Sequence, residues 1–239
     1  MFRQENPIFV FRGPFGIPVE IGGSILFLAM LFIGFGATNP DLLLQGVILF
    51  AMVVVSIFLH ELGHAWGARV QGVPVQKIVL YGGGGYCQHA STSAYVAELI
   101  VAMGPIVNLV LWAVSSLGAW WIVESFAAVQ AVTPELVASM DAWFAIYGYL
   151  NMFAWINLVL FVLNMVPVQP LDGGKLLHLG LLRLLPQITA LRIAGAIGLV
   201  FAILWLPAML LMYFQFGWLL LFVPQIAVHW QMAKGIVPV

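Results

Sequence analysis

The stretch SIFLHELGHAWGARV, from Ser56 to Val70, sets two histidines and a glutamate among apolar residues. The chain around it is 239 residues long, 63% hydrophobic and only 7% charged. About a quarter of the residues in a soluble globular domain are charged, so this composition predicts an integral membrane protein. Ionisable side chains are costly inside a bilayer and usually have a functional role there. The quoted stretch therefore predicts a membrane helix that carries a candidate site.

Long apolar runs with few charges, without alternation of apolar and polar residues, favour membrane helices over a membrane β-barrel. We predict an all-α polytopic membrane protein that forms a single domain over residues 1–239, with no separate soluble domain. About six spans are expected, at 21–36, 42–70, 95–123, 140–165, 188–206 and 207–230. The last two are divided at the sequence WLPAM, where Pro207 interrupts the apolar run.

The positive charges support this count of spans. With six spans, all eight lysines and arginines fall at the two termini, between spans two and three, or between spans four and five. The other three connections contain acidic residues and no positive residue. The positive-inside rule then predicts that both termini face the cytoplasm, and we expect the cell membrane of a prokaryote. The net charge of −1 gives no basic surface that would favour nucleic acid as a partner.

Three connecting segments predict structure other than membrane helices. VPVQKIVLYGGGGYCQ, residues 73–88, alternates apolar and polar residues before four glycines, which predicts a small β-element between spans two and three at the cytoplasmic face. FVFRGPFGIPVEI, residues 9–21, has a similar pattern and could supply a partnering strand. LDGGKLLHLGLLRLLP, residues 171–186, is too short and too charged to span a bilayer, so we expect an amphipathic helix on the cytoplasmic face.

His60, Glu61 and His64 form the pattern H-E-x-x-H. Residues i and i+4 share one face of a helix, so the two imidazoles converge as two ligands of a tetrahedral zinc ion should. Glu61 lies roughly 100° around the helix from His60, close enough to act as general base on a water at the metal. The alternative is a pair of packed histidines with a hydrogen-bonded glutamate, which is less favoured inside a membrane span.

A catalytic zinc site needs a third protein ligand, and several residues could supply it. His60 and His64 lie about six to ten residues from the cytoplasmic end of the second span, roughly 9–15 Å deep. Asp172 emerges on the same side, behind a helix broken by two prolines, and two glycines follow it. The alternative for Asp172 is a turn or capping residue. The other candidate ligands are His89, Glu98, His178 and His229.

The chain resembles the site-2 protease family, a family of intramembrane zinc metalloproteases. The resemblance rests on HELGH in the second span and on N-x-x-P-x-x-x-L-D-G, from Asn164 to Gly173. It extends over nearly the whole chain through GIPVEI, VPVQKIVLYGGGG and GPIVN, the last from Gly104 to Asn108. The six-span arrangement is similar to the compact branch of that family.

This resemblance implies one zinc ion held by His60, His64 and Asp172, with Glu61 as general base. It also implies hydrolysis of a peptide bond in or next to a transmembrane segment of a membrane-protein substrate, in regulated intramembrane proteolysis. The expected partners are therefore that substrate, with its transmembrane helix, and the lipid bilayer. The sequence leaves the oligomeric state open.

The resemblance further implies that Asn164 helps to bind or polarise the substrate carbonyl, and an amide near a metal can stabilise an oxyanion. The alternative for Asn164, and the favoured role of Asn108, is hydrogen bonding between helices. The glycines from Gly82 to Gly85 are either a flexible turn or a place where a substrate strand approaches closely. The adjacent strand edge could then pair with an unwound peptide.

Three other functions could use the same four site residues. A proton or metal-ion transporter would use them as a relay or transit site, but it would favour further ionisable groups across the membrane, and the remaining acids lie near span ends. A relative that binds substrate without cleaving it is only weakly disfavoured, because the ligands and the base are intact. Another membrane zinc protease, with a glutamate as third ligand, is disfavoured because no acidic residue follows Asp172.

Overall fold

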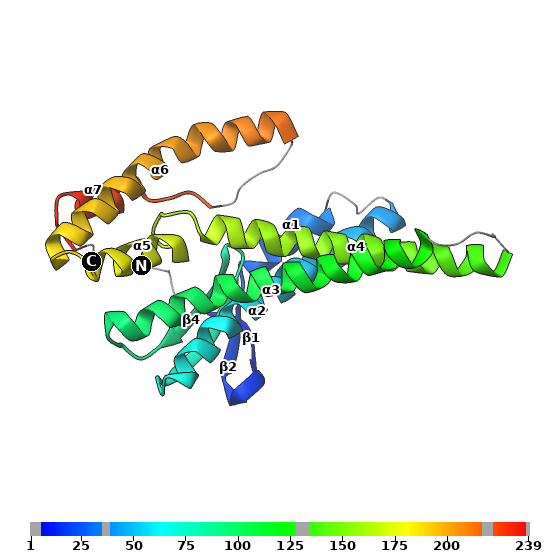
Figure 1. The fold of residues 1–239 in the computed structure, drawn as a ribbon, viewed down its shortest axis with the longest axis horizontal. Coiled ribbons are helices and arrows are strands. Elements are labelled where there is room, and N and C mark those ends of the chain that lie inside the picture. The colour runs from blue at the N-terminus through cyan, green and yellow to red at the C-terminus, as the bar shows by residue number, and fades with distance from the viewer. Residues whose placement is uncertain (1–5, 35–38, 128–133, 217–221, 238–239) are drawn as a thin grey trace.

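A computed structural model describes residues 6–34, 39–127, 134–216 and 222–237 (Figure 1). Long helices dominate it, and four short strands form one sheet. The elements in chain order are β1 (Pro7–Arg12), a 3-10 helix (Pro14–Gly16), β2 (Pro18–Gly22), α1 (Ile25–Ile33), α2 (Pro40–Val70), β3 (Val75–Tyr81), β4 (Gly84–His89), α3 (Ala94–Ala127), α4 (Pro134–Asn164), α5 (Asp172–Leu182), α6 (Gln187–Phe216) and α7 (Ile226–Ala233).

Four helices in the described part of the chain are long and apolar enough to cross a membrane: Pro40–Val70, Ala94–Phe126, Met140–Asn164 and Gln187–Gln215. Many of their large apolar side chains are exposed, as expected where lipid rather than water surrounds a helix. The predicted mostly helical membrane fold is therefore confirmed. The count of six spans stays a prediction. The first expected span, 21–36, begins within β2 and contains only the nine-residue α1, and its end falls outside the described residues.

The predicted division between a fifth and a sixth span at Pro207 is wrong. Helix α6 continues through Pro207 to Phe216. A proline is tolerated in a membrane helix when neighbouring groups and small local adjustments satisfy the freed backbone carbonyl, so the sequence signal for a break is weaker here than in water. The chain returns beside α6, where Nε1 of the buried Trp205 donates to the carbonyl oxygen of Phe222 at 2.7 Å.

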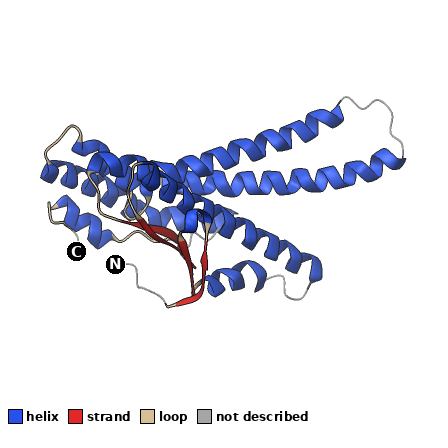
Figure 2. Cartoon of the chain, turned by 90° about the horizontal axis from the view of Figure 1, so that it is seen from below, coloured by secondary structure: helices blue, strands red, loops and turns tan. Residues whose placement is uncertain are grey.

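The two predicted strand regions form a single sheet in the order β1-β2-β3-β4. Strand β2 pairs parallel to β3, with Val19 opposite Ile78, so the N-terminal segment supplies the expected partner strand. Strands β3 and β4 pack on α2, and Figure 2 shows the red sheet lying against the helices. The core cluster there consists of Ile17, Val19, Ile25, Ala65, Ile78 and Leu80. Since β4 pairs with β3 and also contacts α2, this packing brings one strand beside the HELGH stretch.

Helices α2 and α3 approach each other through small residues. A Cβ atom added at Gly63 would lie 2.6 Å from the carbonyl oxygen of Met103, and one added at Gly67 would lie 2.9 Å from the Cγ of Met103. Gly63 and Gly67 are one turn apart, so α3 lies against a glycine stripe, as small-xxx-small packing between membrane helices allows. This close packing is what places the polar residues of α3 next to His60 and His64.

Replacing Gly63 by alanine should destabilise the protein, because the new methyl group would lie 2.6 Å from the backbone oxygen of Met103. We expect a loss of about 1–3 kcal/mol in the free energy of unfolding, the usual cost of overpacking, measured by thermal unfolding in detergent micelles. Gly180→Ala on α5 is the matched control, because nothing lies within 4 Å of its added Cβ. Equal stability losses in the two variants would contradict the close packing.

Candidate metal centre

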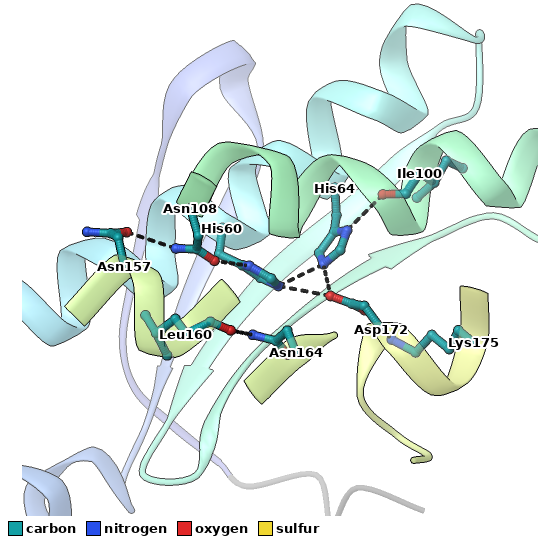
Figure 3. A network of polar contacts seen from close by, with 9 residues as sticks. All are labelled: His60, His64, Ile100, Asn108, Asn157, Leu160, Asn164, Asp172 and Lys175. Carbon is teal, nitrogen blue, oxygen red and sulfur yellow. Dashed lines mark hydrogen bonds and ion pairs between the residues drawn. The ribbon is translucent and has the colours of Figure 1, made fainter. Parts of the chain in front are cut away.

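Two histidines of α2 and the aspartate that begins α5 meet in the interior (Figure 3). The Nε2 atoms of His60 and His64 and the Oδ2 atom of Asp172 each lie 3.1 Å from the other two. The two imidazole rings are nearly perpendicular, at 87°. All three residues are buried. The three atoms therefore form an almost equilateral triangle in the interior of the protein.

The proton positions on the outer ring nitrogens, the two Nδ1 atoms, determine whether the Nε2 atoms present lone pairs to the triangle. Nδ1 of His64 lies 2.8 Å from the carbonyl oxygen of Ile100; because a carbonyl only accepts, Nδ1 carries a proton, and in the neutral imidazole Nε2 then presents a lone pair. Nδ1 of His60 lies 2.5 Å from Oδ1 of Asn108, which fixes the same tautomer. With both rings neutral, as ligands of a metal are, all three atoms of the triangle are acceptors. Three acceptors at this separation repel one another unless a proton or a metal cation lies between them.

The triangle fits a zinc ion. Zinc binds histidine nitrogen and carboxylate oxygen at about 2.0–2.2 Å, so two ligands of a tetrahedral site lie about 3.3 Å apart. The observed edges of 3.1 Å are close to that value. Two imidazoles and one carboxylate are also a ligand set of catalytic zinc sites, in which a further position stays open.

Helix α3 supplies the space for the two rings. Ile100, Gly104 and Asn108 are spaced by four residues, so they lie on one face of α3. A Cβ atom at Gly104 would overlap the His64 ring and lie 2.7 Å from Nε2 of His60. The face of α3 thus matches the histidine face of α2, with a gap where the imidazoles meet. Gly104 was named from the sequence only as the first residue of the GPIVN motif. Its spacing of four residues from Asn108 could have shown that the two share one face of a helix.

Asp172 reaches the triangle because the chain turns tightly between α4 and α5. Added Cβ atoms at Gly173 and Gly174 would overlap the backbone of Met165 and of Val168. The sequence DGG therefore lets the first turn of α5 rest on the loop that precedes it. This contact aims the aspartate into the protein instead of toward its surface.

Lys175 holds the other oxygen of the aspartate and was not singled out from the sequence. Its Nζ lies 3.0 Å from Oδ1 of Asp172, one turn along α5. Burial raises the pKa of the Asp172 carboxyl, but the nearby histidines and Lys175 lower it more, so that the pKa lies below its usual range. Asp172 is accordingly a carboxylate with one oxygen paired and the other facing His60 and His64.

Glu61 lies beneath strand β4. It is buried, and one of its carboxylate oxygens lies within 4.8 Å of ring nitrogens of both His60 and His64. A Cβ atom at Gly85 would lie only 2.7 Å from Cγ of Glu61, so the strand can cover Glu61 only with a glycine there. Burial, and then the charge of Glu61, raises the pKa of the Cys87 thiol to about 12. Cys87 therefore stays neutral and is a poor metal ligand.

Asn164 is the last residue of α4 and lies near the triangle in Figure 3. Its Nδ2 donates to the carbonyl oxygen of Leu160, 3.0 Å away in its own helix. An amide nitrogen has two hydrogens, so this bond uses one of them.

The other candidate third ligands have different surroundings. Glu98 forms a bidentate ion pair with Arg183. His89 lies 2.8 Å from the carbonyl oxygen of Ala90. His229 is buried in α7, against Gly198 of α6. His178 lies on α5, where burial lowers its pKa.

Comparisons with known proteins identify the family of this chain. A family model described as Peptidase family M50 matches residues 48–206. The chain belongs to peptidase family M50. The resemblance to the site-2 protease family is thereby confirmed, and with four apolar helices the M50 chain is an integral membrane protein.

Individual relatives of this M50 chain cover more than its catalytic motif. A zinc metalloprotease of Methanocaldococcus jannaschii is 28% identical over 185 residues, which are 77% of this chain and 48% of that protein. A relative from Synechocystis is 31% identical over 174 residues, 68% of this chain and 41% of the relative. This chain thus spans about half the length of the curated relatives it matches, or less.

A solved structure supports the fold of the M50 chain. The site-2 protease from Methanocaldococcus jannaschii is similar with a TM-score of 0.61 at 24% identity, over 95% of this chain and 92% of that chain. At that identity the likeness concerns the fold alone.

Gly104→Ala in the M50 chain should lower zinc affinity at least about tenfold, the range seen when the surroundings of metal ligands are altered. The physical reason is the overlap of the new methyl group with the His64 ring. Zinc binding would be measured by competition with a chelator. Gly118→Ala on the same helix is the control, since its added Cβ meets only the end of the Leu150 side chain, at 3.3 Å. Unchanged affinity in Gly104→Ala would contradict the assignment of the metal to this triangle.

Proposed function

We propose that this chain is a zinc metalloprotease that hydrolyses a peptide bond in or next to a transmembrane segment of a membrane protein. The observation that carries the proposal is the buried triangle of three acceptors with Glu61 beside it, on a helix long and apolar enough to span a membrane. Membership of peptidase family M50 and the zinc metalloprotease from Methanocaldococcus jannaschii support it.

In this proposal His60, His64 and Asp172 hold one zinc ion. When bound, zinc supplies a Lewis acid that polarises the substrate carbonyl and lowers the pKa of a water. Glu61 takes a proton from the attacking water and later returns it to the leaving amine. The second N–H of the Asn164 amide donates to the substrate carbonyl oxygen as negative charge develops there.

A substrate helix hides its carbonyls in its own hydrogen bonds, so a short stretch must unwind before it can be cleaved. Strand β4 is at the end of the sheet order and lies over Glu61. We infer that an unwound substrate segment pairs with the free edge of β4, as peptides add to exposed sheet edges elsewhere. That position would bring the scissile carbonyl beside the general base.

The membrane orientation follows from the charges. We propose an even number of spans with both termini in the cytoplasm of a prokaryotic cell, because the lysines and arginines then all lie on one side. The site would lie toward the cytoplasmic side, since it is close to the end of α2 that carries Arg69.

Glu61→Gln should keep zinc and lose cleavage, because the amide preserves the shape of the side chain but cannot accept the proton. We expect cleavage of a single-pass membrane substrate to fall at least about a hundredfold, the lower range for general acid–base catalysis. Asp172→Ala should lose both zinc and cleavage. Zinc content and proteolysis would be measured on the same purified samples. Full activity of Glu61→Gln would contradict the proposed mechanism. Metal flux into liposomes by a wild type that cleaves no substrate would favour a transporter.

Gly85→Ala should separate catalysis from metal binding. Its methyl group would lie 2.7 Å from Cγ of Glu61 and displace that side chain, whereas no such contact is made with the histidines. We expect zinc content to be unchanged and cleavage to fall. Gly83→Ala, in the turn that precedes β4, is the control, because its added Cβ would be equally crowded, at 2.8 Å, but by the ring of Tyr81 and not by Glu61. Equal cleavage by the two variants would contradict the placement of Glu61 under β4.

A further inference from the structure

A buried chain of side-chain amides leads away from His60 through three helices (Figure 3). Oδ1 of Asn108 on α3 lies 2.5 Å from Nδ1 of His60, and Nδ2 of Asn108 donates to Oδ1 of Asn157 on α4 at 2.9 Å. Nδ2 of Asn157 donates to the carbonyl oxygen of Phe153 at 2.9 Å and to Oγ of Ser56 at 3.0 Å. The side chains of Asn108, Asn157 and Ser56 are fully buried.

The direction of every bond in this chain is set at its far end. The Phe153 carbonyl can only accept, so the NH2 group of Asn157 must face it. Oδ1 of Asn157 then faces Asn108 and takes a bond from its NH2 group, which turns Oδ1 of Asn108 toward His60. An acceptor at that position requires a proton on Nδ1 of His60. In the neutral imidazole the lone pair is therefore on Nε2, in the triangle.

We propose that Asn157 is a positioning residue that sets the tautomer and the ring orientation of His60 through Asn108, although it touches neither the metal triangle nor Glu61. The proposal rests on the metal site described under the proposed function. His64 reaches the same tautomer in one step, from the carbonyl of Ile100. Each histidine is thus oriented by a backbone carbonyl of a neighbouring helix. His64 contacts the carbonyl of Ile100 on α3 directly, and His60 is connected to the carbonyl of Phe153 on α4 through the amides of Asn108 and Asn157.

Ser56 has a different part in the chain. A hydroxyl can donate or accept, so it imposes no direction on Asn157. Removing it leaves the bond from Asn157 to Phe153 in place. Ser56→Ala is therefore a matched control: it deletes a fully buried polar group of the same network without changing which way the amides point.

The competing explanation is that these bonds only hold α2, α3 and α4 together. Both explanations predict a loss of thermal stability when Asn157 is replaced, so stability cannot distinguish them. The ligand field of a bound metal can. A cobalt(II) ion has absorption bands that depend on the geometry of its ligands, and a tether between helices would not alter them in the folded protein.

The test is a Co²⁺ titration of the zinc-free, detergent-solubilised wild type, Asn157→Leu and Ser56→Ala. In Asn157→Leu we expect altered visible absorption bands and a Kd for Co²⁺ raised about 10–100-fold, as for other residues behind a metal ligand. In Ser56→Ala we expect wild-type bands and a Kd within about twofold. Asn157→Ser serves if the leucine variant does not fold. The serine hydroxyl can bond the carbonyl four residues back, but the side chain is too short to reach Asn108. We therefore expect the same altered bands and raised Kd for Co²⁺ as in Asn157→Leu.

Wild-type bands and Kd in a folded Asn157 variant overturn the positioning role and leave the metal site intact. A shift of equal size in Ser56→Ala also overturns it, because that variant keeps the direction of the chain. A wild type that binds no Co²⁺ overturns the metal site itself, and the positioning role with it.

Discussion

The structure depends on three groups whose Nε2 and Oδ2 atoms face one another inside the protein with edges of 3.1 Å, all of them hydrogen-bond acceptors when both imidazoles are neutral. Such an arrangement is unfavourable by itself, since electrostatic repulsion is strong where water is excluded. It persists only because each group is held from behind: His64 by Ile100, His60 by Asn108, and Asp172 by Lys175. A cation at the centre turns the same three lone pairs into ligands.

Holding the groups from behind requires backbones to come unusually close. The glycines of α2 let α3 approach, Gly104 leaves room for the two rings, and Gly173 with Gly174 lets α5 rest on its own loop. A methyl group at any of these positions would overlap or crowd its neighbours. The glycines are therefore part of the site's geometry as much as the ligands are. They explain why a polar cluster can be buried in a protein whose helices otherwise present apolar side chains outward.

Local sequence was enough for part of this site. The spacing in HELGH predicts two convergent histidines because it depends on a single helix, and the strand patterns in residues 9–21 and 73–88 predict a sheet. Asp172 was one of five candidate ligands, because a contact across 112 residues depends on how helices pack. The predicted division at Pro207 was wrong, since a proline destabilises a membrane helix less than it destabilises a helix in water. Asn157 belongs to no motif, and only its neighbours reveal its role.

The character of the buried network bears on the choice between a protease and a transporter. A polar path that starts at His60 and crosses three helices resembles a proton route, but its members are two amides and a hydroxyl, and it ends at the carbonyl of Phe153. Amides do not gain or lose protons near neutral pH, so the path orients and does not conduct. A histidine locked in one tautomer keeps Nε2 available as a ligand, which suits a metal that stays through turnover. A carrier must release its cargo in every cycle, and a fixed set of three acceptors opposes that release.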